Sequence, residues 1–282
     1  MRELSLGSGM SQRVYNELCR LIYHHSRIFL TLDKESFLAS RLAQHKRELQ
    51  ANDWDSYLKI LLRADKGIEI EKLIDLVTTN HTYFFRERQH FDRLSHELLP
   101  QLTAGNPQTR TQLKCWSVAA SSGEEVVTLA ITLAEYAKHN MPFDWYIHAT
   151  DISWRMLKKA QAAIYAIDVL NLPSEQLMAR YFLKGTGDYQ GQCKVKTELM
   201  QKVKYARANI FQSKLPVPDR FHVILCRNVM LYFDQTSQQQ LISRLEQMLE
   251  PGGLLLIGLT ESIFNLNHKL EKLNDGIFRR IH

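Results

Sequence analysis

From Leu113 onward, short runs of apolar residues alternate with longer segments of helical periodicity, and this alternation strongly restricts the possible folds. The apolar runs predict buried strands at 113–119, 145–150, 222–227 and 254–258. The segments between them, with apolar residues three or four positions apart, predict helices at 124–140, 153–163 and 237–250. Strands joined by helices of this length form right-handed crossovers in a mostly parallel sheet. We therefore predict an α/β fold for residues 113–282.

The first 77 residues follow a different pattern, with helical periodicity and little strand character. Val14, Leu18 and Leu21 recur at helical spacing, and Gly67 interrupts a later helical run. We predict that residues 1–77 form a small all-α bundle. Residues 78–112 are expected to be a linker with helical content that contributes to a ligand site.

Residues 181–209 interrupt the alternation of strands and helices. Three glycines between positions 185 and 191 precede two stretches, 194–197 and 203–206, in which apolar and polar residues alternate. Alternation around glycine-rich turns is typical of antiparallel strands. We predict a small antiparallel hairpin or meander inserted into the α/β domain.

The net charge of +6 is concentrated in one region of the chain. Residues 171–215 carry eight Lys or Arg against three Asp or Glu, a local charge of +5. A nucleic-acid footprint would spread its positive charge further, so we expect a local acidic partner and no nucleic acid. A solvated basic hairpin without any partner explains the same charge pattern.

The sequence carries no signal for export or membrane insertion. No apolar run reaches the roughly 18 residues of a membrane span, and residues 1–10 lack the apolar core of a secretory signal. The cysteines are far apart and form no CxxC pair, which favours reduced thiols and gives no metal-site signal. We expect a cytoplasmic protein without a bound metal.

Residues at the carboxyl ends of the predicted strands indicate a ligand, because parallel sheets bind ligands there. The small residues of 117–123 let a ligand approach the backbone, but the glycine spacing for a pyrophosphate is missing. Glu124 and Glu125 would repel phosphates, or simply complement a helix dipole. Asp151 ends the second strand, where an acid can accept from ribose hydroxyls or cap the next helix. These features suit S-adenosylmethionine, an adenosyl ligand without phosphates, whose sulfonium favours carboxylate and aromatic surroundings.

Two further segments place polar residues beside aromatic ones. In 78–87, three consecutive aromatics precede Arg86. The aromatics can simply staple the bundle to the sheet, whereas an arginine beside an apolar cluster usually pairs with an oxyanion. After the third strand, Asn228 can donate and accept hydrogen bonds, and Tyr232 would bring a phenol near the site. An ordinary buried strand end is the alternative for this last segment.

These segments together resemble the chemotaxis receptor methyltransferases, the CheR family. The resemblance rests on TNHTYFFRE (79–87), WSVAASSGEE (116–125), ATDIS (149–153), RYFLKGTG (180–187) and LCRNVMLYFD (225–234), in the family's order. It covers about residues 15–280. It implies a helical N-terminal domain, a Rossmann-like S-adenosylmethionine-dependent methyltransferase domain, and an antiparallel β-subdomain inserted into the latter.

The resemblance also implies an activity and a set of site residues. The enzyme would transfer a methyl group from S-adenosylmethionine to glutamate side chains of chemotaxis receptors, leaving methyl esters and S-adenosylhomocysteine. Arg86 and Tyr232 match the positions that the family places beside the transferred methyl. The implied cofactor-binding residues are Asn80, Thr82, Arg86, Glu125, Asp151, Asn209, Ile210, Asn228 and Val229. Because a free glutamate is ionised near neutral pH, no catalytic His or Cys is required.

The implied partner is the cytoplasmic domain of a chemotaxis receptor. Some members of the family dock a peptide from the receptor's C-terminus on the inserted subdomain, here at about 184–206. The cations that would favour an acidic peptide are Lys184, Lys194, Lys196, Lys202, Lys204 and Arg207. A lysine-protected strand edge without a partner is the alternative.

The chain departs from the family at two places. Val126-Val127 replaces a common Pro-Tyr pair, and Gly258-Leu-Thr-Glu261 replaces a common Gly-His-Ser-Glu.

Two other functions compete with this interpretation. A nucleic-acid methyltransferase would carry a different motif in place of Arg227-Asn-Val-Met230. A non-catalytic scaffold that senses the cofactor would be expected to lack Arg86 or Tyr232, and both are present.

Overall fold

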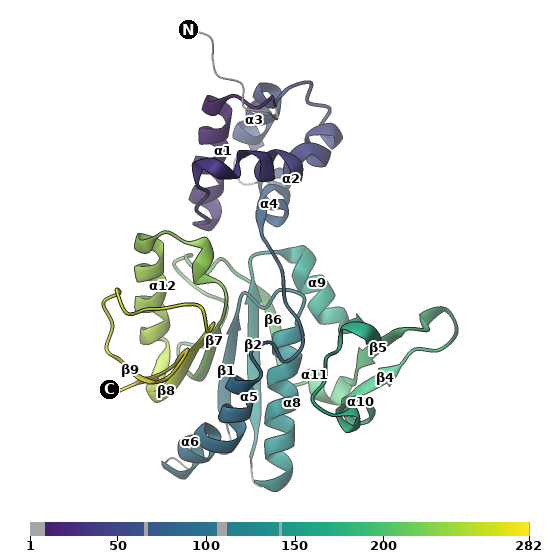
Figure 1. The fold of residues 1–282 in the computed structure, drawn as a ribbon, viewed down its shortest axis with the longest axis vertical. Helices are drawn as coiled ribbons and strands as arrows, with labels where there is room; N and C mark the ends of the chain where they lie inside the picture. Colours follow the sequence, from purple (N-terminus) through teal and green to yellow (C-terminus); the bar gives the residue numbers. More distant parts are fainter. Residues whose placement is uncertain (1–8, 65–66, 106–111, 141–142, 282) are drawn as a thin grey trace. The chain divides into compact units, whose positions relative to one another are not determined.

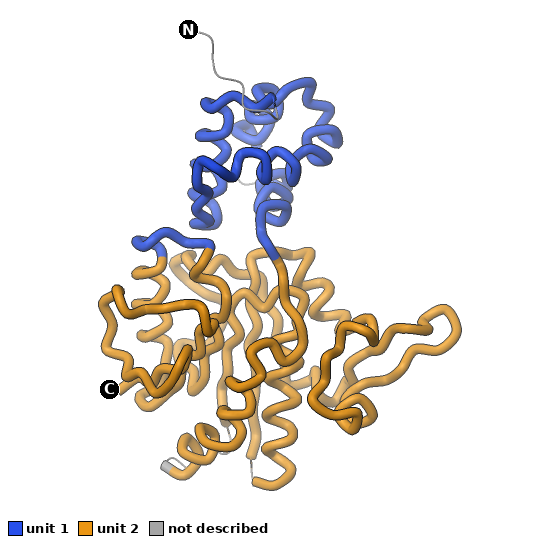
Figure 2. Tube along the Cα trace, viewed as in Figure 1, with its two compact units in different colours: residues 1–79, 232–237 blue, residues 80–231, 238–282 orange. Residues whose placement is uncertain are grey.

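The computed structural model describes residues 9–64, 67–105, 112–140 and 143–281 of the chain. The chain divides into two compact units (Figure 2). Unit 1 comprises Met1–Thr79 with Tyr232–Ser237, and unit 2 comprises Asn80–Leu231 with Gln238–His282. None of the helices within the described ranges is long and apolar enough to cross a membrane.

Unit 1 is helical, as predicted. Its described helices are α1 (Gln12–Ser26), the 3-10 turn η1 (Leu32–Lys34), α2 (Glu35–Glu48), α3 (Trp54–Ala64) and α4 (Ile68–Val77). They pack around fully buried side chains that include Leu18, Leu42 and Leu61. Residues 232–237 belong to this unit: Tyr23 Oη donates to Asp234 Oδ2 at 2.9 Å, for example.

Unit 2 is built on a seven-stranded sheet with the order β6-β2-β1-β7-β8-β10-β9 (Figure 1). The strands are β1 (Leu113–Val118), β2 (Trp145–Asp151), β6 (Val203–Arg207), β7 (Phe221–Cys226), β8 (Leu249–Ile257), β9 (Leu270–Asn274) and β10 (Ile277–Arg280). Neighbouring strands from β6 to β8 in this order pair in parallel, whereas β10 pairs antiparallel with both β8 and β9. The central strands are mainly apolar because helices cover the sheet. The predicted α/β fold is confirmed.

Helices precede and connect these strands. The connecting helices are α8 (Glu124–His139), α9 (Trp154–Ala162) and α12 (Gln235–Gln247). Ahead of β1, a nearly continuous helical run consists of α5 (Gln89–Arg93), the π-helix η2 (Leu94–Leu98) and α6 (Leu99–Gly105). Because α8 contacts α5, η2 and β2, the helices α8, α5 and η2 lie on one face of the sheet (Figure 1).

A separate three-stranded antiparallel sheet has the order β3-β5-β4. Its strands are β3 (Ile164–Ala166), β4 (Phe182–Lys184) and β5 (Gln192–Val195), accompanied by η3 (Ile167–Val169), α10 (Glu175–Tyr181), η4 (Gly187–Tyr189) and α11 (Thr197–Met200). The predicted antiparallel subdomain is confirmed, but its composition is corrected. One strand comes from before the predicted insert, and residues 203–206 lie in β6, which pairs in parallel with β2.

The last part of the chain also differs from the prediction. β8 begins at Leu249 and includes Pro251-Gly252-Gly253, where we predicted the end of a helix. The hairpin β9–β10 was not predicted. Charged residues such as Glu271 and Lys272 dilute the apolar pattern of β9, as is common in a strand at the edge of a sheet.

Candidate active site

Three neighbouring parallel strands, β2, β1 and β7, end at the same edge of the sheet. Val118 pairs with Thr150 and Ser117 pairs with Leu225, so the loops after these strands are adjacent. Ligands of open α/β sheets bind at this edge. The topology of unit 2 therefore gathers the loop after β1, the end of β2 and the loop after β7 at one place.

The loop after β1 has a backbone conformation that few sequences tolerate. Ala119, Ser121 and Gly123 have φ angles of 55°, 49° and 96°, in the left-handed region. A Cβ on Gly123 would lie 2.9 Å from both Ala160 Cβ and Tyr165 Oη, so only glycine fits there. Left-handed non-glycine residues cost about 1–3 kcal/mol each and cluster at functional sites. Small side chains thus permit a strained turn at the carboxyl end of β1.

Asp151 anchors this loop from the end of β2. Its carboxylate accepts hydrogen bonds from the N–H groups of Ser121 and Ser153, both at 2.8 Å. The alternative role, capping α9 with a side chain, is taken by Ser153, whose Oγ accepts from Met156 N–H at 3.1 Å. Asp151 therefore holds the loop after β1 from the end of β2.

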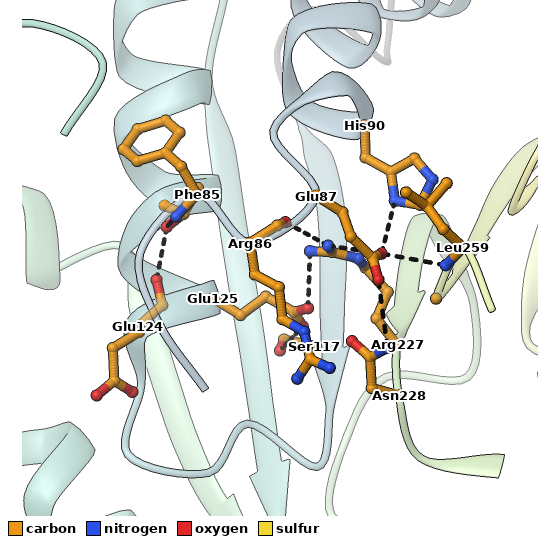
Figure 3. Close-up of polar contacts among 12 residues, drawn as sticks. Phe85, Arg86, Glu87, His90, Ser117, Glu124, Glu125, Arg227, Asn228 and Leu259 are labelled. Atoms are coloured by element: carbon orange, nitrogen blue, oxygen red, sulfur yellow. Dashed lines mark hydrogen bonds and ion pairs between the residues drawn. The ribbon is translucent and has the colours of Figure 1, made fainter. Parts of the chain in front are cut away.

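A buried arginine at the end of β7 joins three segments of the site (Figure 3). The Arg227 side chain, 1% exposed, donates to Glu125 Oε2 at 3.1 Å and to Glu87 Oε2 at 3.0 Å. It also donates to the main-chain carbonyl of Arg86, and its guanidinium lies over the ring of Phe91. The planar fork of a guanidinium suits several acceptors at once. Arg227 was not predicted as a site residue, because the burial of a charge cannot be recognised from a strand-end motif.

The pKa values of the two carboxylates beside Arg227, those of Glu87 and Glu125, are shifted in opposite directions. Burial raises the pKa of Glu87, but the charge and hydrogen bonds of Arg227 outweigh it, so that the pKa is lowered overall. For Glu125, burial dominates and raises the pKa, although Arg227 opposes it. Ser117 Oγ donates to the other oxygen of Glu125 at 2.8 Å. Both carboxylates are thus engaged by groups of the protein itself.

Glu261 fixes the loop after β7 and was not predicted as a site residue. Its carboxylate accepts from the N–H groups of Asn228 and Met230 at 2.8 Å, and from that of Gly258 at 2.7 Å. Asn228 has a left-handed φ of 58°, and its Nδ2 donates to Glu87 Oε1 at 3.3 Å. The available signal was the glutamate that the Gly-Leu-Thr-Glu segment shares with the family's Gly-His-Ser-Glu pattern.

Arg86 lies between two residues with left-handed backbones, since Phe85 and Glu87 both have φ angles of 54°. Its Nη1 donates to the carbonyl of His81 at 2.9 Å, and its guanidinium carbon lies 5.8 Å from the centre of the Tyr83 ring. Figure 3 shows the side chain extending alongside the network just described. The guanidinium is thus held near the strand ends.

The other predicted residues of unit 2 are distributed around the same edge. The carbonyl of Asn80 accepts from Ser121 Oγ at 3.4 Å, and Val229 is buried directly after Asn228. Thr82 is half-buried in the segment before Arg86.

Asn209 and Ile210 follow β6, whose parallel partner is β2. The N–H of Ala208 donates to the carbonyl of Asp151 at 3.0 Å, which brings the start of this loop to the end of β2. Asn209 Oδ1 accepts from Phe211 N–H at 2.9 Å, and Arg244 donates to the carbonyl of Ile210. Tyr232 belongs to unit 1, where its hydroxyl donates to the carbonyl of Thr79 at 3.4 Å.

Comparison with known proteins matches both units. Residues 80–278 match the CheR methyltransferase SAM-binding domain, and residues 13–78 match the CheR methyltransferase all-alpha domain. The chain belongs to the CheR methyltransferase family. This CheR-family chain is 36% identical to the chemotaxis protein methyltransferase of Salmonella typhimurium over 91% of its own length and 86% of that protein. It is 33% identical to the chemotaxis protein methyltransferase of Borreliella burgdorferi, over 99% and 98% of the two chains.

The CheR-family chain is an S-adenosylmethionine-dependent methyltransferase, which confirms the predicted enzyme class and cofactor. The residues at the strand ends fit this cofactor. The loop over 119–125 contains no basic side chain, and Asp151 places a carboxylate at the end of β2. These features favour a polyhydroxyl, cationic ligand over a phosphate.

Proposed function

We propose that this enzyme methylates glutamate side chains of chemotaxis receptors. The observation that carries the proposal is that both carboxylates near Arg86, those of Glu87 and Glu125, are already hydrogen-bonded within the protein. Glu87 and Glu125 each accept from Arg227, so neither is poised to remove a proton from an acceptor. A carboxylate acceptor is already ionised near neutral pH and needs no such base. Relatives that are named chemotaxis protein methyltransferases support the same assignment.

The reaction is an in-line displacement. S-adenosylmethionine supplies an electrophilic methyl group on a positively charged sulfur. A glutamate oxygen of the receptor forms a bond to this carbon as the carbon–sulfur bond breaks with its electron pair remaining on sulfur. The products are a neutral methyl ester and S-adenosylhomocysteine, and no proton is transferred. Positioning of this kind can lower a barrier by about 7–11 kcal/mol at most.

The side chains have separate tasks in this proposal. Arg86 orients the incoming carboxylate through its guanidinium, and Tyr232 donates a hydrogen bond or lines the path of the methyl group. The residues that hold the cofactor are Asn80, Thr82, Arg86, Glu125, Asp151, Asn209, Ile210, Asn228 and Val229. Asp151 and Glu125 supply acceptors for hydroxyl and ammonium groups.

The test uses the purified full chain, tritiated S-adenosylmethionine and membranes of the host bacterium. We expect label on receptor-sized protein that is released as volatile methanol after mild base, as a glutamate methyl ester requires. Base-stable label, or label on nucleic acid in a whole-lysate arm, would contradict the proposal. A reaction without the enzyme measures the background.

Asp151→Ala is expected to weaken S-adenosylhomocysteine binding by about 1.5–3 kcal/mol, because hydrogen bonds to a charged group are lost. Part of this loss comes through the loop, since Asp151 accepts from the N–H of Ser121. Calorimetry with the folded variant measures the affinity. Asp144→Ala, which removes an acid at the other end of β2, is the matched control and should bind normally. Equal affinity of Asp151→Ala and the unaltered protein would remove this residue from the cofactor site.

We further propose that the three-stranded sheet docks an acidic peptide from the receptor's C-terminus. In the order β3-β5-β4, the strands β3 and β4 flank the sheet, and a peptide can add to such an edge. Lys184 on β4 and Lys194 on β5 are exposed. Lys204 and Arg207, in contrast, lie on β6 of the large sheet, so they contribute less to this surface than the sequence suggested. Tethering would raise the local receptor concentration to about millimolar.

A peptide with an acidic aromatic-x-x-aromatic end should bind in the micromolar range and more weakly as salt increases. The double variant Lys184→Glu/Lys194→Glu should bind it at least tenfold more weakly. Lys158→Glu, on the exposed part of α9, is the matched control. Fluorescence anisotropy measures all three proteins. Absence of binding at low salt would instead favour a lysine-protected edge without a partner.

A further inference from the structure

The segment that carries Arg86 is held from both sides by buried groups (Figure 3). On one side, the N–H of Phe85 donates to Thr128 Oγ1 at 3.1 Å, and this hydroxyl donates in turn to the carbonyl of Glu124 at 2.7 Å. Thr128 is fully buried in α8. On the other side, Arg227 at the end of β7 donates to the carbonyl of Arg86 itself. The backbone on both sides of this side chain is therefore fixed.

On the side of Arg227, the segment is also held by the side chain of Glu87. Its carboxylate accepts from Arg227 at 3.0 Å, from Asn228 Nδ2 at 3.3 Å and from the N–H of Leu259 at 3.2 Å. His90 Nδ1 lies 3.7 Å from the same carboxylate. One side chain thus ties the segment of Arg86 to the ends of β7 and β8.

This anchoring maintains a conformation that the segment would not adopt alone. Phe85 and Glu87 both have φ angles of 54°, in a region that residues other than glycine rarely occupy. Such conformations persist only where the surroundings hold them. If the anchors were released, the backbone would relax at both residues, and the direction of the side chain between them would change.

We propose that Glu87 and Thr128 are positioning residues for methyl transfer, and that they act by fixing the direction of Arg86. Neither group needs to contact the methyl acceptor. This inference rests on the role proposed above for Arg86 as the residue that orients the receptor carboxylate. It predicts that the two anchors affect turnover only while the arginine side chain is present.

A double-mutant cycle tests this coupling at saturating S-adenosylmethionine, with the labelled-methyl assay on host membranes. Glu87→Ala should lower kcat at least tenfold at saturating cofactor and receptor. Glu87→Gln keeps one oxygen, which can still accept from Arg227 and from the N–H of Leu259 but leaves Asn228 Nδ2 without this acceptor, and it should recover part of the loss. In the Arg86→Ala background, Glu87→Ala should change kcat by less than twofold. Glu97→Ala, an exposed acid on η2, is the matched control and should have no effect.

Thr128→Val gives a second cycle that does not disturb the buried charges. Valine has nearly the same shape but offers no acceptor to the N–H of Phe85, so kcat should fall three- to tenfold in the presence of Arg86 only. This cycle decides the question if Glu87→Ala does not fold. A folded Glu87→Ala with normal kcat, or an effect of equal size with and without Arg86, would overturn the inference. Failure of the unaltered enzyme to form base-labile esters would instead overturn the proposed function.

Discussion

Arg86→Ala should lower the turnover of receptor methylation by about 100-fold, because loss of the guanidinium leaves the incoming carboxylate without a fixed angle of attack. Folding should be nearly unaffected, since the side chain is only half-buried and its hydrogen bond is to the carbonyl of His81. Single-turnover assays at saturating cofactor and receptor measure the chemical step, and thermal unfolding measures the stability.

Arg88→Ala is a close control for this substitution. Arg88 lies two residues further along, is exposed and pairs with Asp92 at 3.2 Å. It should retain normal turnover. If Arg86→Ala also retained normal turnover, Arg86 would have no part in the chemical step.

Tyr232→Phe, which removes one neutral hydrogen bond, should raise the barrier to methyl transfer by only about 0.5–1.5 kcal/mol.

Arg227→Met should destabilise the protein by about 3–5 kcal/mol, the usual result of removing one partner from a buried ion pair. The variant leaves Glu87 and Glu125 with side chains only 14% and 15% exposed and without their cation. Denaturant unfolding measures the loss. Arg93→Met, which breaks an exposed pair with Glu97, should cost at most about 1 kcal/mol. An equal, small loss in both variants would show that the Arg227 network adds little to stability.

The difference in the free energy of unfolding between the unaltered protein and Arg227→Met should change with pH in a predictable direction. In the unaltered protein the lowered pKa of Glu87 stabilises the fold above about pH 4.3, and that contribution is lost as the pH falls through the folded-state pKa. Without Arg227, burial is opposed less strongly, by hydrogen bonds such as those from Asn228, Leu259 and Ser117, so we expect both pKa values to be higher than in the unaltered protein. Protonation then relieves the buried charge, so the stability gap between the two proteins should narrow as the pH falls from about 7 to about 5. A gap that widens on acidification would contradict this account.

The sequence alone was sufficient to predict the α/β fold and its site edge. β1, β2 and β7 are largely buried, so most of their residues are apolar and the strands are easily recognised. Their carboxyl ends carry Ser121, Asp151 and Asn228, and parallel topology requires that these ends share one edge. Family motifs in the same segments then indicated the cofactor and the reaction.

Strand pairing over long distances was decided only by the tertiary structure. Val203–Arg207 alternates like a hairpin strand, yet it pairs in parallel with β2, more than 50 residues earlier. β3 joins the small sheet from before the predicted insert. Alternation specifies which face of a strand is buried, but it does not specify the partner strand.

The anchoring of Arg86 also required the structure. Arg227, Glu87 and Glu261 look like ordinary charged residues in the sequence, where such residues are usually exposed. The fold buries Arg227 and surrounds it with acceptors from two separate segments, at 86–87 and at Glu125. A charge becomes a structural anchor only when distant segments exclude water from it and supply its partners. Local sequence can indicate Arg86 as a candidate site residue, but only the packing of the chain determines what holds its side chain in place.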